Sequence, residues 1–90
     1  MRALAVTETA IDLEAQTVPF LSNNTVVAVN YSAEEVTVQG AVDEAFTVPV
    51  TLATLAAAGT AGAIQEVTLD YQFVRAMAYD AAAVVHFLAN

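Results

Sequence analysis

The stretches Val36-Thr37-Val38-Gln39 and Val67-Thr68-Leu69-Asp70 alternate strictly between apolar and polar side chains. Successive side chains of a β-strand point to opposite faces of a sheet, so this alternation predicts strands with one face on a core and the other in water. Valine and threonine, which dominate both stretches, carry β-branched side chains that suit a pleated surface. The two stretches therefore predict an all-β chain.

Working outward from these stretches, further segments show the same alternation or a similar content of β-branched and aromatic residues. Turn-forming residues separate them at intervals close to the 8–12 residues that are typical of sandwiches and barrels. The further predicted strands cover Ile11–Gln16, Thr25–Asn30, Phe46–Leu52, Tyr71–Tyr79 and Ala83–Leu88. The predicted fold is a small antiparallel β-sandwich or jelly-roll-like barrel of about seven or eight strands, with at most one short helix.

Four parts of the chain need separate interpretation. Ala10–Gln16 contains good helix formers, so a helix competes with the strand there, although the period of the segment is two. Leu52–Ala58 is rich in alanine and precedes Gly59, which is common after the last turn of a helix, so it is either a strand or a short helix. Pro49 has no backbone N–H, which places its strand at a sheet edge or a bulge. Residues 1–24 form either an N-terminal strand or an arm, and residues 25–90 form the sandwich core of a single domain.

Charge and hydropathy limit the partners of the chain. It carries a formal net charge of −8, and Arg2 and Arg75 are its only cations. Nucleic acids and anionic membranes are both recognised through clusters of Lys and Arg, so we expect neither partner. Hydrophobic residues make up 58% of the 90 residues, which is more than so small a domain hides. We therefore expect exposed apolar surface, contacts with other proteins and a homo-oligomer.

The single histidine is the first candidate for catalysis. His86 alternates with Val85 and Phe87 in an apolar stretch, which favours a sheet-face or interface histidine over a catalytic one. Ser22 and Ser32 are the available hydroxyl nucleophiles, and neither lies in a Gly-x-Ser-x-Gly turn. The sequence therefore predicts a protein that is not an enzyme.

Carboxylates are the second candidate, as general acids or metal ligands. Glu34-Glu35 and Asp43-Glu44 are adjacent pairs, whose side chains would point to opposite faces of a strand. The chain has no cysteine, only one histidine and no spaced Asp/Asn loop of the calcium-binding kind. We therefore predict no catalytic residue, no cofactor and no metal ion, and expect both pairs to be solvated.

Arg75 and the tyrosines are candidates for binding. On a two-residue period Arg75 shares a face with Phe73 and Met77, and we expect it to pair with a nearby carboxylate and to pack its stem on the aromatic ring. The alternative is a salt bridge to a partner. Tyr71 and Tyr79 could serve as sugar-binding platforms, although core packing explains them more simply.

The predicted interface lies in the N-terminal segment. Val18 and Pro19 precede two bulky apolar residues, Phe20 and Leu21. Proline favours an extended backbone in the residue before it, and an extended segment loses little entropy on docking. These four residues either dock on a neighbouring subunit or cap the core of their own domain.

From Val26 onward, four short stretches resemble a family of small β-sandwich proteins from the virions of tailed phages. In that family a strand ending in Gln-Gly leads into a turn, and a later strand ends in a Phe/Tyr-Val-Arg run. The matching stretches are Glu35–Gly40, Leu52–Leu55, Glu66–Arg75 and Ala81–Asn90. The turn after Gly40 departs from the pattern, because it reads Ala41-Val42-Asp43-Glu44 and lacks a second glycine.

The resemblance implies a virion structural protein without enzymatic activity. The expected role is a capsid decoration or cement protein on the outside of the particle, which binds the major capsid protein and bridges capsid subunits. Two alternatives remain open, a phage tail or head–tail component and a small carbohydrate- or surface-binding module.

Overall fold

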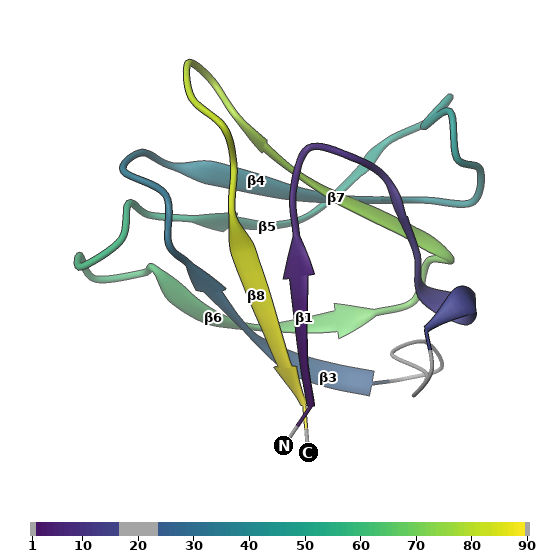
Figure 1. The fold of residues 1–90 in the computed structure, drawn as a ribbon, viewed down its shortest axis with the longest axis horizontal. Coiled ribbons are helices and arrows are strands. Elements are labelled where there is room, and N and C mark those ends of the chain that lie inside the picture. Colours follow the sequence, from purple (N-terminus) through teal and green to yellow (C-terminus); the bar gives the residue numbers. More distant parts are fainter. Residues whose placement is uncertain (1, 17–23, 90) are drawn as a thin grey trace.

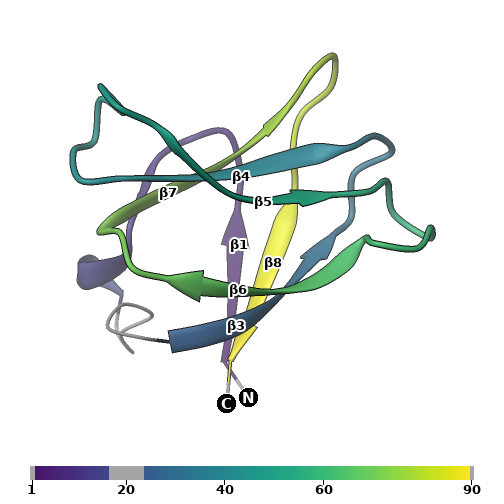
Figure 2. The same cartoon turned by 180° about the vertical axis from the view of Figure 1, so that it is seen from behind.

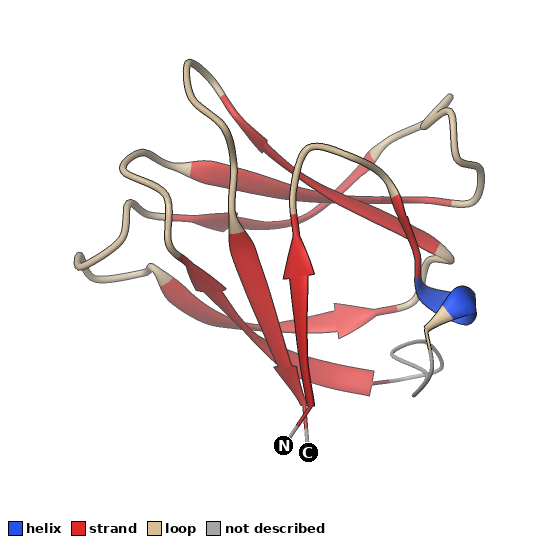
Figure 3. Ribbon diagram, in the orientation of Figure 1, coloured by secondary structure: helices blue, strands red, loops and turns tan. Residues whose placement is uncertain are grey.

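The structure is a computed structural model, and it describes residues 2–16 and 24–89. These residues are almost entirely strands and turns, and the one helical element described is the 3₁₀ turn η1, Leu13–Ala15 (Figure 3). The strands are β1 Arg2–Val6, β2 Ile11–Asp12, β3 Asn24–Asn30, β4 Val36–Ala41, β5 Val50–Leu55, β6 Ile64–Leu69, β7 Phe73–Ala78 and β8 Val85–Ala89.

The strands form two antiparallel sheets of four strands each. Sheet A has the order β1-β8-β3-β6, and sheet B has the order β2-β7-β4-β5. The two sheets cross at an angle, with β4, β5 and β7 in one layer and β8, β3 and β6 in the other (Figures 1 and 2). The all-β prediction is confirmed as a β-sandwich, and the sheets do not close into a barrel.

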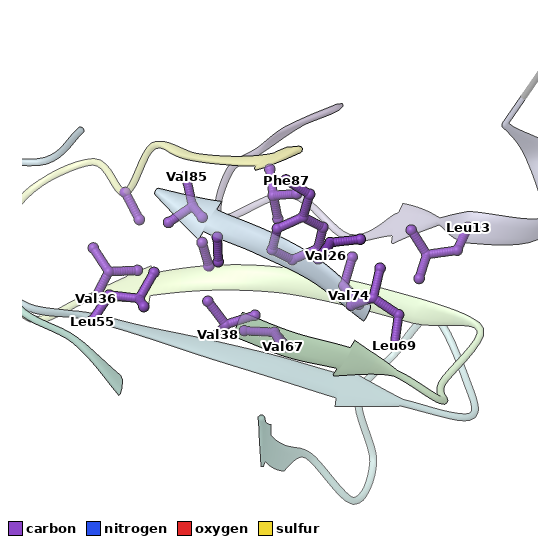
Figure 4. Close-up of a cluster of buried hydrophobic side chains, with 14 of the residues drawn as sticks. Leu13, Val26, Val36, Val38, Leu55, Val67, Leu69, Val74, Val85 and Phe87 are labelled. Atoms are coloured by element: carbon purple, nitrogen blue, oxygen red, sulfur yellow. The ribbon is translucent and has the colours of Figure 1, made fainter. Parts of the chain in front are cut away.

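The core lies between the sheets and is built by the apolar members of the alternating stretches. Val36 and Val38 of β4 and Val67 and Leu69 of β6 are all buried, as their alternation predicted. Figure 4 shows Val26, Val74 and Phe87 meeting between strands of the two sheets. The fully buried side chains of largest volume are Phe87, Leu13, Leu55, Leu69, Val6, Val26, Val36, Val38, Val74, Val85 and Asn30.

The N-terminal residues 2–16 belong to this core. Val6 and Leu13 are completely buried, and the Thr7 carbonyl accepts a hydrogen bond of 2.8 Å from the Ala76 N–H, which joins the end of β1 to sheet B. Of the two interpretations of residues 1–24, the strand therefore holds for residues 2–16. The predicted interface residues Val18, Pro19, Phe20 and Leu21 lie outside the described residues.

The strand predicted over Ile11–Gln16 is wrong beyond its first two residues. Asp12 ends β2, and its carboxylate accepts a hydrogen bond of 3.0 Å from the Glu14 N–H. The Leu13 N–H donates to the Gln72 carbonyl at 2.7 Å. A side chain that bonds to the backbone two residues ahead favours a turn, and here it lets Leu13 point into the core.

The strand predicted over Phe46–Leu52 begins only at Val50. Pro49 precedes it directly, and the strand lies at the edge of sheet B with a register shift opposite Val38 and Gln39, which agrees with the prediction of an edge or bulge. Phe46 adopts a left-handed φ of 52° in the preceding loop. The helix considered over Leu52–Ala58 is absent, because β5 continues to Leu55.

A buried asparagine fastens one corner of the sandwich. The Asn30 amide at the end of β3 donates to the carbonyls of Glu34 at 3.0 Å and Ala56 at 2.8 Å, and its oxygen accepts from the Ser32 N–H at 2.7 Å. Because Glu34 precedes β4 and Ala56 follows β5, one side chain links sheet A to two strands of sheet B.

Candidate binding surface

The outer face of sheet A is apolar over most of two adjacent rows of side chains. Strand register places Ala3, Leu88 and Val27 in one row across β1, β8 and β3, and Ala5, His86, Val29 and Ile64 in the next row across all four strands. Ile64 is 64% exposed, and Val27 is 38% exposed. We call this surface the sheet A face, and it consists of Ala3, Ala5, Val27, Val29, Tyr31, Ile64, Val84, His86 and Leu88.

Two aromatic rings form one end of the sheet A face. The Tyr31 ring packs against the His86 imidazole, with ring centroids 4.7 Å apart and an interplanar angle of 57°. Tyr31 is 56% exposed, so the phenol ring offers contact area to a partner at little cost in side-chain entropy. Glu66 lies at the other end of a row, beside Val27 on the edge strand β6.

The outer face of sheet B is polar by comparison. Thr37 lies between Thr54 and Met77 in one row, and Gln39 lies between Thr51 and Arg75 in the next. The contrast matters because a sheet with one solvated face normally alternates apolar and polar residues, as β4 does and as β3 and β8 do not. Sheet A therefore carries apolar side chains on both of its faces.

Arg75 differs from its prediction. Its Nε donates to the Gln39 Oε1 at 2.8 Å, and its guanidinium lies 4.2 Å from the centre of the Phe46 ring. The expected ion pair with a carboxylate is not formed within the described residues. The long loop between β4 and β5 brings Phe46 over the sheet and satisfies Arg75 with a ring and a neutral amide, which sequence spacing does not reveal.

An open depression of about 420 Å³ lies on the outer side of β4 and β7. It is lined by Glu34, Glu35, Thr37, Gln39, Met77, Ala78 and Tyr79. The Glu34 carboxylate accepts a hydrogen bond of 2.7 Å from the Asp80 N–H, so it fastens the loop between β7 and β8. Tyr79 is fully exposed, against the expectation of core packing, and Tyr71 is half-buried.

The remaining candidate residues serve the fold. The Ser32 hydroxyl accepts a hydrogen bond of 2.8 Å from the Val84 N–H. Asp43 accepts from the Thr47 hydroxyl at 2.6 Å and from the Thr47 N–H at 3.2 Å, which closes the loop after β4. No side-chain hydrogen bond joins His86 to another residue of the described ranges, and Ser22 lies outside them.

Two further observations concern the described part of the chain. Within residues 2–16 and 24–89, no three His, Asp or Glu side chains gather closely enough to hold a metal ion. The described residues also contain no helix long and apolar enough to cross a membrane.

Comparison of the chain with protein families, with curated proteins and with solved structures finds no match.

The sheet A face was missed at the level of sequence, although a signal for it exists. Two segments, Val26–Val29 and Val84–Leu88, consist mostly of apolar residues and do not alternate regularly with polar ones. In an antiparallel sheet such runs indicate strands that are covered on both faces. Period-two patterns identify the core face of a strand, whereas these interruptions of the pattern identify a second apolar face.

Proposed function

We propose that this chain is a non-enzymatic structural protein that binds another protein through the sheet A face. The observation that carries the proposal is the difference between the two outer faces, since sheet A exposes valine, isoleucine, leucine and tyrosine where sheet B exposes threonine and glutamine. Contiguous exposed apolar surface on a small protein marks a contact site.

Charge narrows the kind of partner. The chain has a net charge of −8, while Glu66 is the one carboxylate in the rows of the sheet A face. An apolar patch with one carboxylate beside it, on a molecule of net charge −8, fits a protein partner whose apolar site has a neutral or basic rim. The same charge opposes binding to nucleic acid and to anionic lipid.

The particular role that we propose is a capsid decoration or cement protein on the exterior of a phage virion, with the major capsid protein as its partner. The resemblance of Glu35–Gly40 and Glu66–Arg75 to virion sandwich proteins supports this role, as does the apolar sheet A face. A cement protein needs a rigid fold and a docking surface rather than a catalytic centre.

The first test is the copy number and position of the chain in purified particles of the phage that encodes it. Many copies spread evenly over the shell, measured by quantitative mass spectrometry and electron cryomicroscopy, would support the decoration role. A few copies at one vertex would instead indicate a tail or head–tail component.

The second test places a charge on the sheet A face and measures binding. Ile64→Lys should weaken binding to particles that lack the chain by at least about tenfold, because a charge replaces apolar area at the contact. Thr54→Lys is the matched control, because it adds the same charge to an exposed position on sheet B and should bind normally. Equal binding by both variants, measured by co-sedimentation, would exclude the sheet A face as the docking surface.

A further inference from the structure

The outer edge of β1 presents backbone groups that no described residue satisfies. The Tyr31 N–H donates to the Val84 carbonyl at 3.0 Å, so Val84, and with it His86 and Leu88 by alternation, directs its backbone groups toward β3. The residues between them direct theirs toward β1, where their partners are Arg2, Leu4 and Val6. Ala3 and Ala5 therefore turn their N–H and C=O groups away from β8, to the side of β1 that carries no neighbouring strand in sheet A (Figure 1).

The other three edges of the sandwich carry features that hinder strand addition, whereas β1 carries only the charge of Arg2 at its first residue. β2 has only two residues, β5 follows Pro49 and contains a register shift, and β6 exposes the charged Glu66 at its centre. Short strands, proline, irregular register and charge are the usual protection of sheet edges. β1 is five residues long, regular in register and free of carboxylates.

The side chains of β1 leave room for a neighbouring strand. Ala3 and Ala5 are small and lie on the sheet A face, and Leu4 packs on the core but stays only partly buried. A further strand beside β1 would cover the exposed part of Leu4. A core-facing leucine on an edge strand stays partly exposed because no further strand covers its outer side.

We propose that β1 pairs antiparallel with β1 of a second copy of this chain, about a two-fold axis that passes through Leu4. In this register Ala3 of one copy lies opposite Ala5 of the other, and their N–H and C=O groups form two reciprocal pairs of hydrogen bonds. The arrangement is isologous, as in most two-fold dimers. It joins two copies of sheet A into one continuous sheet of eight strands.

The backbone pattern of β1 favours a second copy as the occupant. The outward N–H and C=O groups of Ala3 and Ala5 are complementary to the same groups of another β1 about a two-fold axis. Copies with a net charge of −8 repel one another, but β1 adds no carboxylate to the contact and includes Arg2, one of the only two cations.

This inference stands on the edge of sheet A and does not require the proposed function. A chain that stays monomeric but binds particles would overturn only the dimer, and a dimer that ignores particles would overturn only the virion role.

Sedimentation equilibrium of the full chain tests the dimer. Ala3→Pro removes one edge donor from each copy but no donor to β8, and losing two of four hydrogen bonds should raise the dimer dissociation constant by about 30-fold. Thr68→Pro is the matched control, because the Asn30 N–H to Ala63 carbonyl bond of 2.9 Å and the register of β6 place the Thr68 N–H on the outer edge of β6. The control should dimerise normally, and circular dichroism checks that both variants fold.

A second variant covers the case in which proline disturbs the fold. Ala3→Asp combined with Ala5→Asp places carboxylates directly opposite each other twice in the dimer, while both stay exposed in a monomer. This variant should sediment as a monomer. A wild-type chain that is monomeric at every concentration overturns the proposal, and so does a dimer that survives both changes.

Cross-linking tests the register, since the chain has no cysteine of its own. In a glutathione redox buffer, a mixture of Ala3→Cys and Ala5→Cys chains should form a mixed disulfide, because these positions lie opposite each other. Neither variant alone should cross-link efficiently. Self-linking of Ala3→Cys, or no linking in the mixture, would overturn this pairing.

Discussion

At the scale of single residues, polar side chains inside the sandwich stabilise the fold through hydrogen bonds to the backbone. Asn30 is buried and hydrogen-bonds to three backbone groups, two in the loop between β3 and β4 and one directly after β5. Removing such a side chain costs more stability than its hydrogen bonds contribute, because the buried backbone groups that lose their partner cannot bond to water instead.

Asn30→Ala should lower the free energy of unfolding by about 2–3 kcal/mol, because two carbonyls and one N–H lose their partner. Urea denaturation monitored by circular dichroism measures the change. Thr25→Ala on the exposed face of the same strand is the control and should stay within about 0.5 kcal/mol of the wild type. Equal effects of the two changes would show that the corner is wetter than its burial indicates.

Gly40 lies one residue before the end of β4, close to where the sequence places the end of this strand. It also has a role that the sequence did not suggest, because a Cβ built on it would come within 2.9 Å of the Tyr71 ring and 3.1 Å of Leu52. The glycine makes room for a ring that crosses the sheet.

Gly40→Ala should therefore cost about 1–3 kcal/mol of stability, as overpacking does. In a Tyr71→Ala background the same change should cost much less, since the ring is gone. A double-mutant cycle from thermal or urea unfolding measures this coupling. Additive effects would mean that the strain at Gly40 does not come from Tyr71.

At the scale of elements, β1 and η1 hold the N-terminal segment in the core. Leu13 is completely buried, although β2 before it has only two residues and η1, which begins at Leu13, is a single turn. The segment is stabilised by its packing rather than by its own secondary structure.

Leu13→Ala should lower the free energy of unfolding by about 3 kcal/mol, because it removes a fully buried side chain and leaves a cavity. Glu14→Ala, at the exposed neighbour, should change stability little. Urea unfolding of both variants gives the comparison. A small loss at Leu13 would restore the view of residues 1–24 as an arm.

Strands were predictable from sequence where one face is buried and the other solvated. Val36, Val38, Val67 and Leu69 alternate with polar residues, and the structure buries all four. The prediction failed where a local hydrogen bond competes with the strand, at Asp12, and where a loop folds back over a sheet, at Phe46. Both depend on contacts between residues that no periodicity records.

The sheet A face was not predicted for a different reason. Whether a side chain such as Ile64 lies on the outside of a sheet depends on strand register, and register depends on residues far along the chain. The apolar excess of the composition indicated exposed apolar surface, but not its position. The prediction placed it at Val18, Pro19, Phe20 and Leu21, outside the described residues.

At the scale of the whole molecule, exposed apolar side chains form contiguous rows on sheet A, whereas the exposed Val42, Val48 and Tyr79 lie in loops. This asymmetry can be measured without a partner. On a hydrophobic interaction column Ile64→Lys should elute clearly earlier than the wild type, while Thr54→Lys should shift little, because only the first change interrupts a contiguous apolar patch. Equal shifts of the two variants would show that retention follows net charge alone.

The pairing of β1 with β8 has a consequence for how the chain is ordered. Arg2 lies opposite Ala89, and Figure 1 shows the start of β1 beside the end of β8. A short linker can therefore join these two positions. A circular permutant that joins these ends through a short glycine-serine linker, and starts instead within the turn Gly59–Gly62, should keep the same sandwich. Cargo fused before Arg2 or after Ala89 would be displayed on the same side of the sandwich.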